Sequence, residues 1–309
     1  MALDLVHTHG KAIRLEFADK PLCTYTYHKN EDPFECLRPY FHPVHSLAGD
    51  LVTIRSPYDH RWHKGIGMVI AVLTDGQTKA NFWGGNSYVH GEGYKAIDNI
   101  GRMHHKGWTE IAVKDLEASF AHMLEWETSA NEIWLQEQRR LTITVRPDKD
   151  YWQLGWQLQL KNTAGKALKI GSPTTEGRPN AGYGGLFWRG PREFSKSATI
   201  YSAAGVEGEA MMGERAEWLA FVGQHDDSLN HSSLIFQDHP DNPRYPTKWF
   251  VRQSEFAVAS FAFMFDEYYE LAPGEELELN YTITVANGNW SADDIAKFCK
   301  LPRLLVDKA

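Results

Sequence analysis

The sequence predicts a single all-β domain over residues 1–309, a large antiparallel β-sandwich with a short C-terminal helix. Three observations predict it: segments that alternate apolar and polar residues, an abundance of aromatic residues (11 Trp, 13 Tyr and 15 Phe), and few helical patterns. Aromatic side chains suit the half-buried surface of a pleated sheet. A chain of 309 residues can bury a sizeable core, and no linker rich in Pro, Gly or Ser divides it.

The clearest strands are two segments in which every second residue is apolar. The first set is Trp152, Leu154, Trp156, Leu158 and Leu160, and the second is Leu277, Leu279, Tyr281, Ile283 and Val285. Period two puts alternate side chains on opposite faces, as in an antiparallel sheet with one buried face. Similar patterns predict strands near residues 11–17, 66–73, 119–127, 132–146, 217–223, 232–237, 248–252 and 257–265.

Residues 291–299 favour a helix. Ser291 is a suitable N-cap, acidic residues occupy the first turn, and Ile295 and Phe298 supply an apolar face. We expect this terminal helix to pack on a sheet.

Glu137 and Arg139 interrupt the otherwise apolar face of residues 133–145. Two explanations remain open. Either the strand bulges or leaves the core at this point, or the two residues form a charged pair that points into a cleft.

Charge and hydropathy exclude several partners. The net charge is −8, and no long basic run occurs, so we expect no nucleic-acid partner. No apolar run approaches the roughly 18 residues of a membrane span, and the N-terminus lacks a signal-peptide pattern. The three cysteines are widely spaced, which indicates neither a disulfide framework nor a zinc motif. We expect a reduced, cytoplasmic protein.

Four of the 14 histidines fall within 22 residues: His42, His45, His60 and His63. Imidazole suits acid/base chemistry because its ordinary pKa is about 6.5, and neutral imidazole also binds metals. Three interpretations remain open. The histidines form an acid/base site in which Asp59 or another carboxylate orients one of them, they bind a divalent metal, or they hydrogen-bond loop backbones.

Two loop-like segments of the second half carry further candidates. Residues 174–192 contain Glu176 and Arg189 among many glycines, and residues 237–252 contain Trp249 and Arg252 among prolines. Arginine forks bind hydroxyls or carboxylates, and a flat ring can cover a sugar face.

Several of these segments carry a family resemblance. They read RPYFHPVHSLAG (38–49), DHRWHKG (59–65), NFW (81–83), EG (176–177), GVEGEAMMGERAEWLAF (205–221) and DHPDNPRYPTKWFVR (238–252). On these motifs the chain resembles a bacterial family labelled methane oxygenase, or PmoA-like. The resemblance spans about residues 38–265, and the last motif is the most specific.

The resemblance implies a large sandwich similar to the galactose-mutarotase supersandwich and a role in sugar catabolism, without naming a reaction. The oxygenase label derives from a membrane protein, which this chain does not resemble in composition. Many members have DHPHHRG where this chain has DHRWHKG. Trp62 replaces one histidine, which weakens a metal-binding interpretation of the motif.

Our leading hypothesis is an acid/base enzyme, an epimerase, lyase or hydrolase, acting on a sugar or keto-sugar. His60 and His63 are the expected proton-transfer groups, with His42 in support, Asp59 orienting and Glu176 as carboxylate partner. The expected substrate-binding residues are Arg38, Tyr40, Trp83, Arg189, Arg252 and Trp249.

Two alternatives belong to other classes. A non-catalytic sugar-binding or regulatory protein would have a ring-lined cleft without a histidine–carboxylate pair in hydrogen-bond reach. A metal-dependent enzyme such as an oxygenase would bind a divalent metal. The expected partner is a small carbohydrate, and a long edge strand also suits a homodimer.

Overall fold

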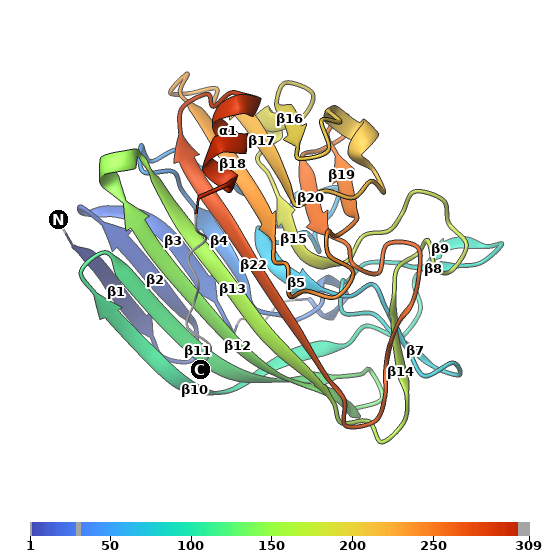
Figure 1. The fold of residues 1–309 in the computed structure, drawn as a ribbon. Helices are drawn as coiled ribbons and strands as arrows, with labels where there is room; N and C mark the ends of the chain where they lie inside the picture. The colour runs from blue at the N-terminus through green and yellow to red at the C-terminus, as the bar shows by residue number, and fades with distance from the viewer. Residues whose placement is uncertain (1, 29–31, 302–309) are drawn as a thin grey trace.

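Two eight-stranded sheets pack face to face in the computed structural model, which describes residues 2–28 and 32–301 (Figure 1). The first sheet contains, in order, β1 (Leu3–Thr8), β2 (Ala12–Phe17), β3 (Lys20–Thr26), β4 (Tyr40–Val44), β5 (Ile66–Val69), β15 (Gly185–Arg189), β20 (Val258–Phe261) and β19 (Trp249–Arg252). The second contains β10 (Arg102–Lys114), β11 (Glu117–Glu127), β12 (Ile133–Arg146), β13 (Tyr151–Asn162), β22 (Glu276–Asn287), β18 (His231–Asp238), β17 (Trp218–Gln224) and β16 (Thr199–Ser202).

Smaller elements surround the sandwich. A four-stranded sheet is formed by β21 (Tyr269–Leu271), β14 (Leu168–Gly171), β6 (Val72–Thr74) and β7 (Lys79–Ala80), and a two-stranded one by β8 (Ser87–Val89) and β9 (Gly93–Lys95). Short 3-10 helices occupy Pro33–Glu35, Pro147–Lys149, Arg192–Phe194 and Gly208–Met211, and the α-helix is α1 (Ala292–Cys299). The predicted class, a large antiparallel β-sandwich with a short C-terminal helix, is confirmed.

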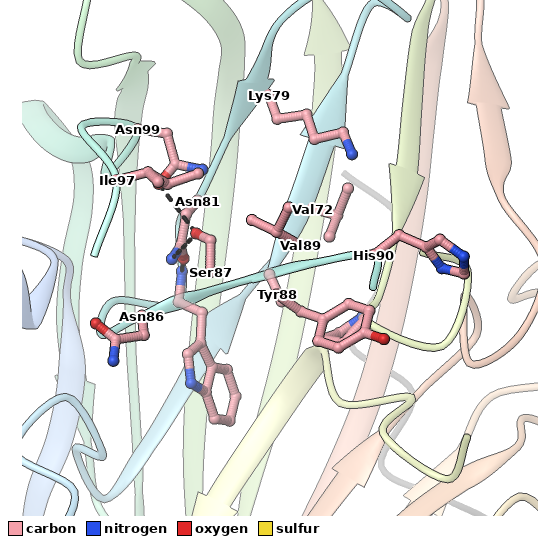
Figure 2. A pocket seen from close by; sticks show the side chains of 13 residues that line it. Val72, Lys79, Asn81, Asn86, Ser87, Tyr88, Val89, His90, Ile97 and Asn99 are labelled. Atoms are coloured by element: carbon pink, nitrogen blue, oxygen red, sulfur yellow. Dashed lines mark hydrogen bonds between the residues drawn. The ribbon is translucent and has the colours of Figure 1, made fainter. Parts of the chain in front are cut away.

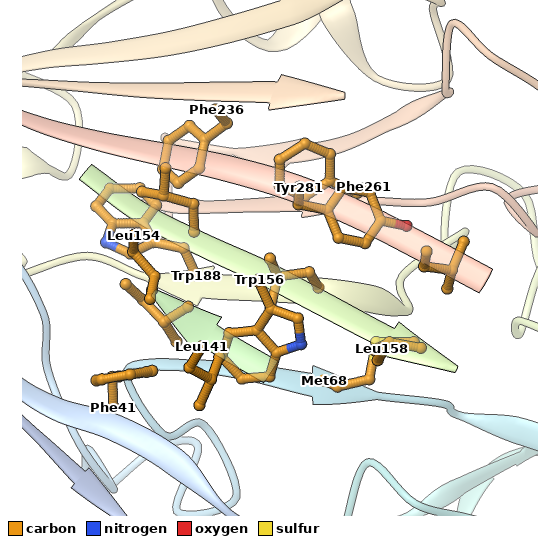
Figure 3. Close-up of a cluster of buried hydrophobic side chains, with 14 of the residues drawn as sticks. Phe41, Met68, Leu141, Leu154, Trp156, Leu158, Trp188, Phe236, Phe261 and Tyr281 are labelled. Atoms are coloured by element: carbon orange, nitrogen blue, oxygen red, sulfur yellow. The ribbon is translucent and has the colours of Figure 1, made fainter. Parts of the chain in front are cut away.

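The two alternating segments form adjacent central strands. The apolar residues of β13 and β22 face one another in register, with Trp152 opposite Val285 and Trp156 opposite Tyr281. All ten apolar residues of the two sets are buried. They meet rings from the first sheet, for example Phe261 against Tyr281, with 4.3 Å between ring centroids (Figure 3). The period-two pattern thus fixes which face of each central strand enters the main core.

Glu137 and Arg139 lie between the two sheets. Strand β12 pairs with β13 without interruption from Leu135 to Arg146, so the expected bulge is wrong. The expected cleft is also wrong, because both side chains are wholly buried. Arg139 donates from Nε and Nη2 to the Glu137 carboxylate at 2.5 and 2.8 Å. The charges are accommodated in the core because they form a bidentate pair.

A longer line of hydrogen bonds continues from this pair, and we call it the buried polar chain (Tyr25, His105, His122, Glu137 and Arg139). Arg139 Nη1 donates to Tyr25 Oη at 3.0 Å, and Tyr25 Oη lies 2.9 Å from His122 Nε2. His122 Nδ1 lies 2.9 Å from His105 Nδ1. Each side-chain nitrogen and oxygen from His122 to Glu137 along this chain has a partner, as buried polar groups require.

Helix α1 begins as predicted. Ser291 Oγ accepts a hydrogen bond from Asp294 N at 3.2 Å, and the Asp294 side chain returns to Ser291, which completes a capping box. Ile295 is fully buried against the outer face of β17 and β18. No helix in residues 2–28 and 32–301 is long and apolar enough to cross a membrane.

The outer face of the first sheet carries a second apolar cluster. Val69 of β5, Phe187 of β15, Phe250 of β19 and Val258 of β20 belong to it, whereas their neighbours on each strand enter the main core. Connecting segments cover this face, and one of them contributes Trp83. Several predicted site residues lie here.

Candidate functional site

A group of rings on this outer face, which we call the histidine–aromatic cluster, brings His60 and His63 together. Its members are His60, Trp62, His63, Trp83, Phe187 and Phe256. The His60 and His63 rings are 4.7 Å apart and tilted by 34°. The His63 ring also contacts Trp83 at 5.2 Å and Phe187 at 5.1 Å, with near-perpendicular geometry. Phe256 lies 4.7 Å from His60 and 5.6 Å from His63.

Tight turns in residues 56–63 place the two histidines side by side. His60 N donates to Pro57 O at 3.0 Å, His63 N donates to His60 O at 2.9 Å, and Ser56 N donates to His63 O at 2.8 Å. Because the segment folds back on itself, side chains three residues apart lie side by side. The spacing HRWH therefore has a direct structural reason.

Asp59, the residue expected to orient a histidine, is hydrogen-bonded to His60. Its Oδ2 lies 3.1 Å from His60 Nδ1, and its Oδ1 accepts a hydrogen bond from Arg192 at 2.6 Å. Partial burial works to raise the pKa of Asp59, but the hydrogen bonds from His60 and Arg192 lower it to about 2. Asp59 is therefore a carboxylate at neutral pH, and the His60 nitrogen beside it must be the protonated one.

His63 is 4% exposed and carries no charge at neutral pH. Burial lowers the pKa of His63 well below its ordinary value, and electrostatic interaction with His60, Arg189 and Arg38 lowers it further. Its Nδ1 is buried and has no hydrogen-bond partner. Such an atom is costly in a folded protein and calls for an explanation.

Arg189 is fully buried beside these rings, at the end of β15. Its Nη1 donates to Ala257 O at 3.2 Å and to Gly190 O at 3.4 Å, and its guanidinium lies over the Phe256 ring at 4.7 Å. Its Nε and Nη2 have no partner. Burial lowers the pKa of Arg189 to about 10; Asp59 opposes this effect and Arg192 adds to it. Arg189 is still a cation at neutral pH.

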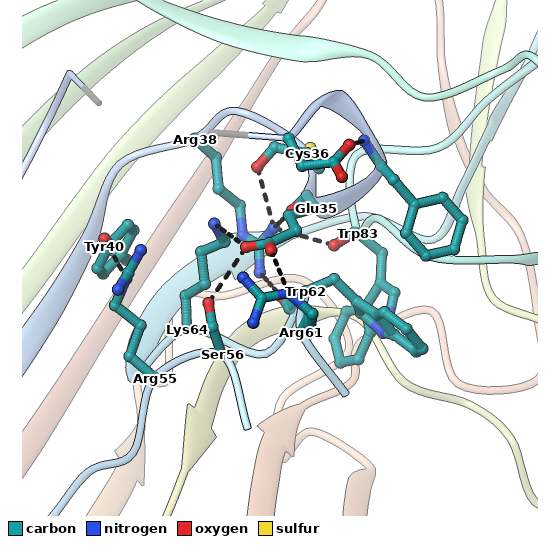
Figure 4. A network of polar contacts seen from close by, with 12 residues as sticks. Glu35, Cys36, Arg38, Tyr40, Arg55, Ser56, Arg61, Trp62, Lys64 and Trp83 are labelled. Carbon is teal, nitrogen blue, oxygen red and sulfur yellow. Dashed lines mark hydrogen bonds and ion pairs between the residues drawn. The ribbon is translucent and has the colours of Figure 1, made fainter. Parts of the chain in front are cut away.

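Glu35, a carboxylate that no sequence pattern marks, lies beneath the cluster. It is 3% exposed and accepts hydrogen bonds from Arg61 Nε at 2.8 Å, Lys64 Nζ at 3.1 Å and Ser56 Oγ at 3.2 Å (Figure 4). The Lys64 side chain is itself wholly buried. Glu35 thus ties the HRWHK segment to the rest of the fold. No local pattern marks it, because its partners follow 21 to 29 residues later in the sequence.

Arg38 and Tyr40, the expected substrate-binding residues, are instead buried and hydrogen-bonded to neighbouring protein groups. Arg38 donates to the backbone oxygens of Trp62 at 2.5 Å and Trp83 at 2.9 Å, so it holds two cluster residues from behind (Figure 4). The Tyr40 hydroxyl accepts a hydrogen bond from Arg55 at 2.8 Å, and the residue is 2% exposed. His42 lies on β4, with Nδ1 2.9 Å from Thr53 Oγ1.

Trp83 connects the cluster to a pocket of about 240 Å³. Lys79, His90 and the amides of Asn81, Asn86 and Asn99 line the pocket (Figure 2). Asn81 accepts hydrogen bonds from Trp83 N at 2.8 Å and Gly84 N at 2.9 Å, which fixes the position of the indole. Trp83 is therefore one wall of the pocket and contacts His63 as well.

Glu176 lies by this pocket and is not bonded to the two histidines. Lys79 and Tyr268 donate hydrogen bonds to its carboxylate, and its backbone oxygen lies 3.1 Å from His90 Nδ1. Burial raises the pKa of Tyr268 to about 12, and Glu176 contributes to that rise. The expected role of Glu176 as partner of His60 and His63 is corrected accordingly.

Trp249 was expected to bind substrate, and this expectation is wrong. It lies in the main core, fully buried, with its ring 4.5 Å from Phe261 and its Nε1 donating to Ala216 O at 2.9 Å. Its ring has no free face for a ligand. Arg252, two residues later on β19, is only partly buried, lies over Phe250 at 5.8 Å and donates to Asn180 O at 3.3 Å.

The described residues contain no group of three or more His, Cys, Asp or Glu side chains arranged to hold a metal ion. His60 and His63, which the sequence suggested as ligands, lie with their rings 4.7 Å apart and tilted by 34°, and the neighbouring Asp59 carboxylate is already bonded to Arg192. These residues do not form a preformed metal centre.

Known proteins provide three kinds of comparison: curated sequences, solved structures and family models. No curated protein sequence matches the chain. Among solved structures, the chain is similar to the galactosidase domain of an alpha-galactosidase-sucrose kinase, AgaSK (10% identity, TM-score 0.42, covering 92% of this chain and 42% of that one). It is also similar to the GH36 alpha-galactosidase AgaA of Geobacillus stearothermophilus (10%, 0.39, 96% and 42%) and to galactose 1-epimerase of Lactobacillus acidophilus NCFM (10%, 0.41, 93% and 99%).

The chain spans about two fifths of the length of the two galactosidase structures and nearly all of the epimerase. A family model matches residues 12–300, which is most of the sequence. The chain therefore belongs to the family described as a family of unknown function (DUF6807).

Proposed function

We propose that the protein is an acid/base enzyme acting on a sugar or keto-sugar, with His60 and His63 at the reaction centre. The observation that carries this proposal is the Asp59–His60 pair, joined at 3.1 Å, with the His60 ring 4.7 Å from the ring of the buried His63. Because ionised Asp59 accepts a hydrogen bond from His60 Nδ1–H, Nε2 retains its lone pair. A carboxylate that fixes the tautomer in this way prepares an imidazole to act as a base.

The proposed step is proton transfer at a carbon beside a carbonyl. His60 Nε2 takes the proton, the electron pair of the broken C–H bond forms an enediolate, and His60 becomes an imidazolium. Arg189 stabilises the negative charge on the oxygen. If the enediolate turns over in the site, the His60 imidazolium returns the proton to the opposite face and gives an epimer. If a group instead leaves the next carbon as an alcohol or water, it takes the proton from the imidazolium, and the product is that of a lyase.

The surroundings suit a sugar. The rings of Trp62 and Tyr183 are only partly buried, and Tyr183 lies 4.7 Å from Trp83. The neighbouring pocket of about 240 Å³ is a little smaller than the roughly 300–1,000 Å³ of pockets for drug-sized ligands, which suits a monosaccharide. The motif resemblance described above supports the same class of substrate.

The Asp59–His60 pair also favours an enzyme over a binding protein. A non-catalytic sugar-binding protein has no need of a carboxylate that fixes a histidine tautomer. In this chain that carboxylate is engaged on both oxygens, by His60 and by Arg192. The pair is built rather than incidental.

Proton NMR in D2O tests the proposal without presupposing the reaction. Aldoses, ketoses and hexuronates are incubated with the protein, and exchange of anomers, deuterium uptake at carbon and new signals are followed. We expect turnover of at least one sugar, reduced about 100-fold or more in His60→Ala because loss of general acid/base catalysis costs roughly that much. We also expect reduced turnover in His63→Ala, because His63 packs against the His60 ring. The control is His104→Ala, a half-exposed histidine on β10. Full turnover in the His60 and His63 variants would refute the proposal.

A further inference from the structure

Arg189 has an unusual pattern of hydrogen bonding. Its Nη1 is held by two backbone oxygens, whereas Nε and Nη2 are buried without partners. These two nitrogens form one edge of the guanidinium, and their N–H bonds point the same way. That edge is the one that binds both oxygens of a carboxylate at once.

A second, independent group points to the same place. His63 Nδ1 is also buried and unpartnered. The Phe256 ring contacts both residues. Its centre lies 4.7 Å from the Arg189 guanidinium and 5.6 Å from the centre of the His63 ring. One partly exposed ring thus covers two polar groups that lack partners.

The charges around the cluster favour an anion. Two of the nearby cations meet the cluster itself: Arg38 donates to Trp62 and Trp83, and Arg189 lies over Phe256. The other three meet the two nearby carboxylates, Arg61 and Lys64 at Glu35 and Arg192 at Asp59. Five positive charges against two negative ones stand out in a chain whose net charge is −8. Leaving a buried cation without a counterion is expensive, so a ligand that supplies the missing negative charge gains affinity.

We propose that Arg189 and His63 form a carboxylate-binding site covered by Phe256, and that the substrate is a sugar acid. The proposal rests on the function given above and names its substrate class. The carboxylate takes the Nε/Nη2 edge of Arg189, so the oxygen that Arg189 stabilises during proton transfer is an oxygen of this carboxylate. His63 contributes Nδ1–H as a further hydrogen-bond donor. Phe256 turns outward to admit the ligand; its ring is partly exposed, and side chains at the surface change rotamer rapidly.

Calorimetric titration with D-galacturonate and D-galactose tests the site, since these two sugars differ only at C6. We expect D-galacturonate to bind at least tenfold more tightly. Arg189→Met should abolish this preference, Arg189→Lys should reduce it at least fivefold because lysine lacks the fork, and Phe256→Ala should strengthen galacturonate binding. The matched control is Arg215→Met. Arg215 also donates to two backbone oxygens, at 2.7 and 2.8 Å, but it is exposed and distant in the sequence.

Three results would overturn the proposal: equal binding of the two sugars, a preference that survives in both Arg189 variants, or tighter binding of D-galactose 6-phosphate than of D-galacturonate. The last would assign the site to phosphate. Should Arg189→Met fail to fold, Arg189→Lys and Phe256→Ala still decide. Turnover of neutral sugars without a galacturonate preference would refute this site and leave the proposed function standing. Arg189-dependent galacturonate binding without turnover of any sugar would refute the proposed function and leave this site standing.

Discussion

Two regions of the molecule each hold a pair of neighbouring histidines with an arginine behind them. In the histidine–aromatic cluster the rings of His60 and His63 are 4.7 Å apart, and Arg189 lies beside them. In the buried polar chain the rings of His105 and His122 are 5.1 Å apart, and the line of hydrogen bonds ends at Arg139. Both arginines are buried.

The two regions differ in what the arginine meets. Arg139 is paired through all three of its nitrogens, two of them to Glu137, and Glu137 also accepts from Trp126 Nε1 at 2.8 Å. Arg189 has two nitrogens without partners. A complete polar network stabilises a fold, whereas an incomplete one is tolerated where function requires it. A histidine-rich segment therefore indicates a ligand site only when some of its buried polar atoms are left unpaired.

The largest expected effect comes from removing the counterion of Arg139. The buried polar chain then holds a buried arginine without a full set of partners, as the histidine–aromatic cluster does. Glu137→Gln preserves the shape but removes the charge that offsets Arg139, so we expect the free energy of unfolding to fall by about 3–5 kcal/mol. Urea denaturation measures the loss. The control is Glu278→Gln on the exposed face of β22, where we expect a change of no more than about 0.5 kcal/mol. A loss below about 1 kcal/mol for Glu137→Gln would show that Arg139 does not need its carboxylate, and the comparison would lose its meaning.

Acid should weaken both regions. Burial lowers the pKa of His63 and of His122 well below the ordinary value, and Arg139 and His105 lower that of His122 further. Burial also lowers the pKa of His105, and with the nearby His7, His28 and His9 it brings that pKa to about 4. A histidine whose pKa is lower in the folded state binds fewer protons there. Its contribution to stability is therefore complete above about pH 6.5 and is lost as the pH falls below that value.

Urea denaturation between pH 7 and pH 5 measures this loss. For His63 and for His122 we expect about 2 kcal/mol each over this range, at up to about 1.4 kcal/mol per pH unit. His63→Gln and His122→Gln should each make the decline shallower. Declines as steep as that of the wild type in both variants would contradict the assigned pKa directions.

The core was predictable from the sequence because it depends on a period-two pattern. Trp156 and Tyr281 alternate with polar neighbours and lie opposite one another in the core. The same pattern could have placed Trp249 correctly. On the predicted strand 248–252, Trp249 and Val251 share the core face, while Phe250 and Arg252 lie on the outer face. Strand β10, which is polar and half-exposed, has no clear alternation and was not predicted.

The site was predictable only where its residues are close in sequence. Asp59, His60 and His63 lie within five residues, and their turns bring them together. Glu35 and Phe256 come from distant segments, and only the tertiary fold places Glu35 against Arg61 and Phe256 against His60. The pairing of Glu176 with Lys79 and Tyr268 likewise depends on separations of 97 and 92 residues.

One measurement tests both regions at once. The histidine ring signals of the protein are recorded by NMR during titration with D-galacturonate and assigned with His60→Gln, His63→Gln, His105→Gln and His122→Gln. We predict that the His60 and His63 signals shift and saturate, while the His105 and His122 signals stay in place. Unmoved His60 and His63 signals, or shifts confined to His105 and His122, would contradict the assignment of the ligand site to the histidine–aromatic cluster.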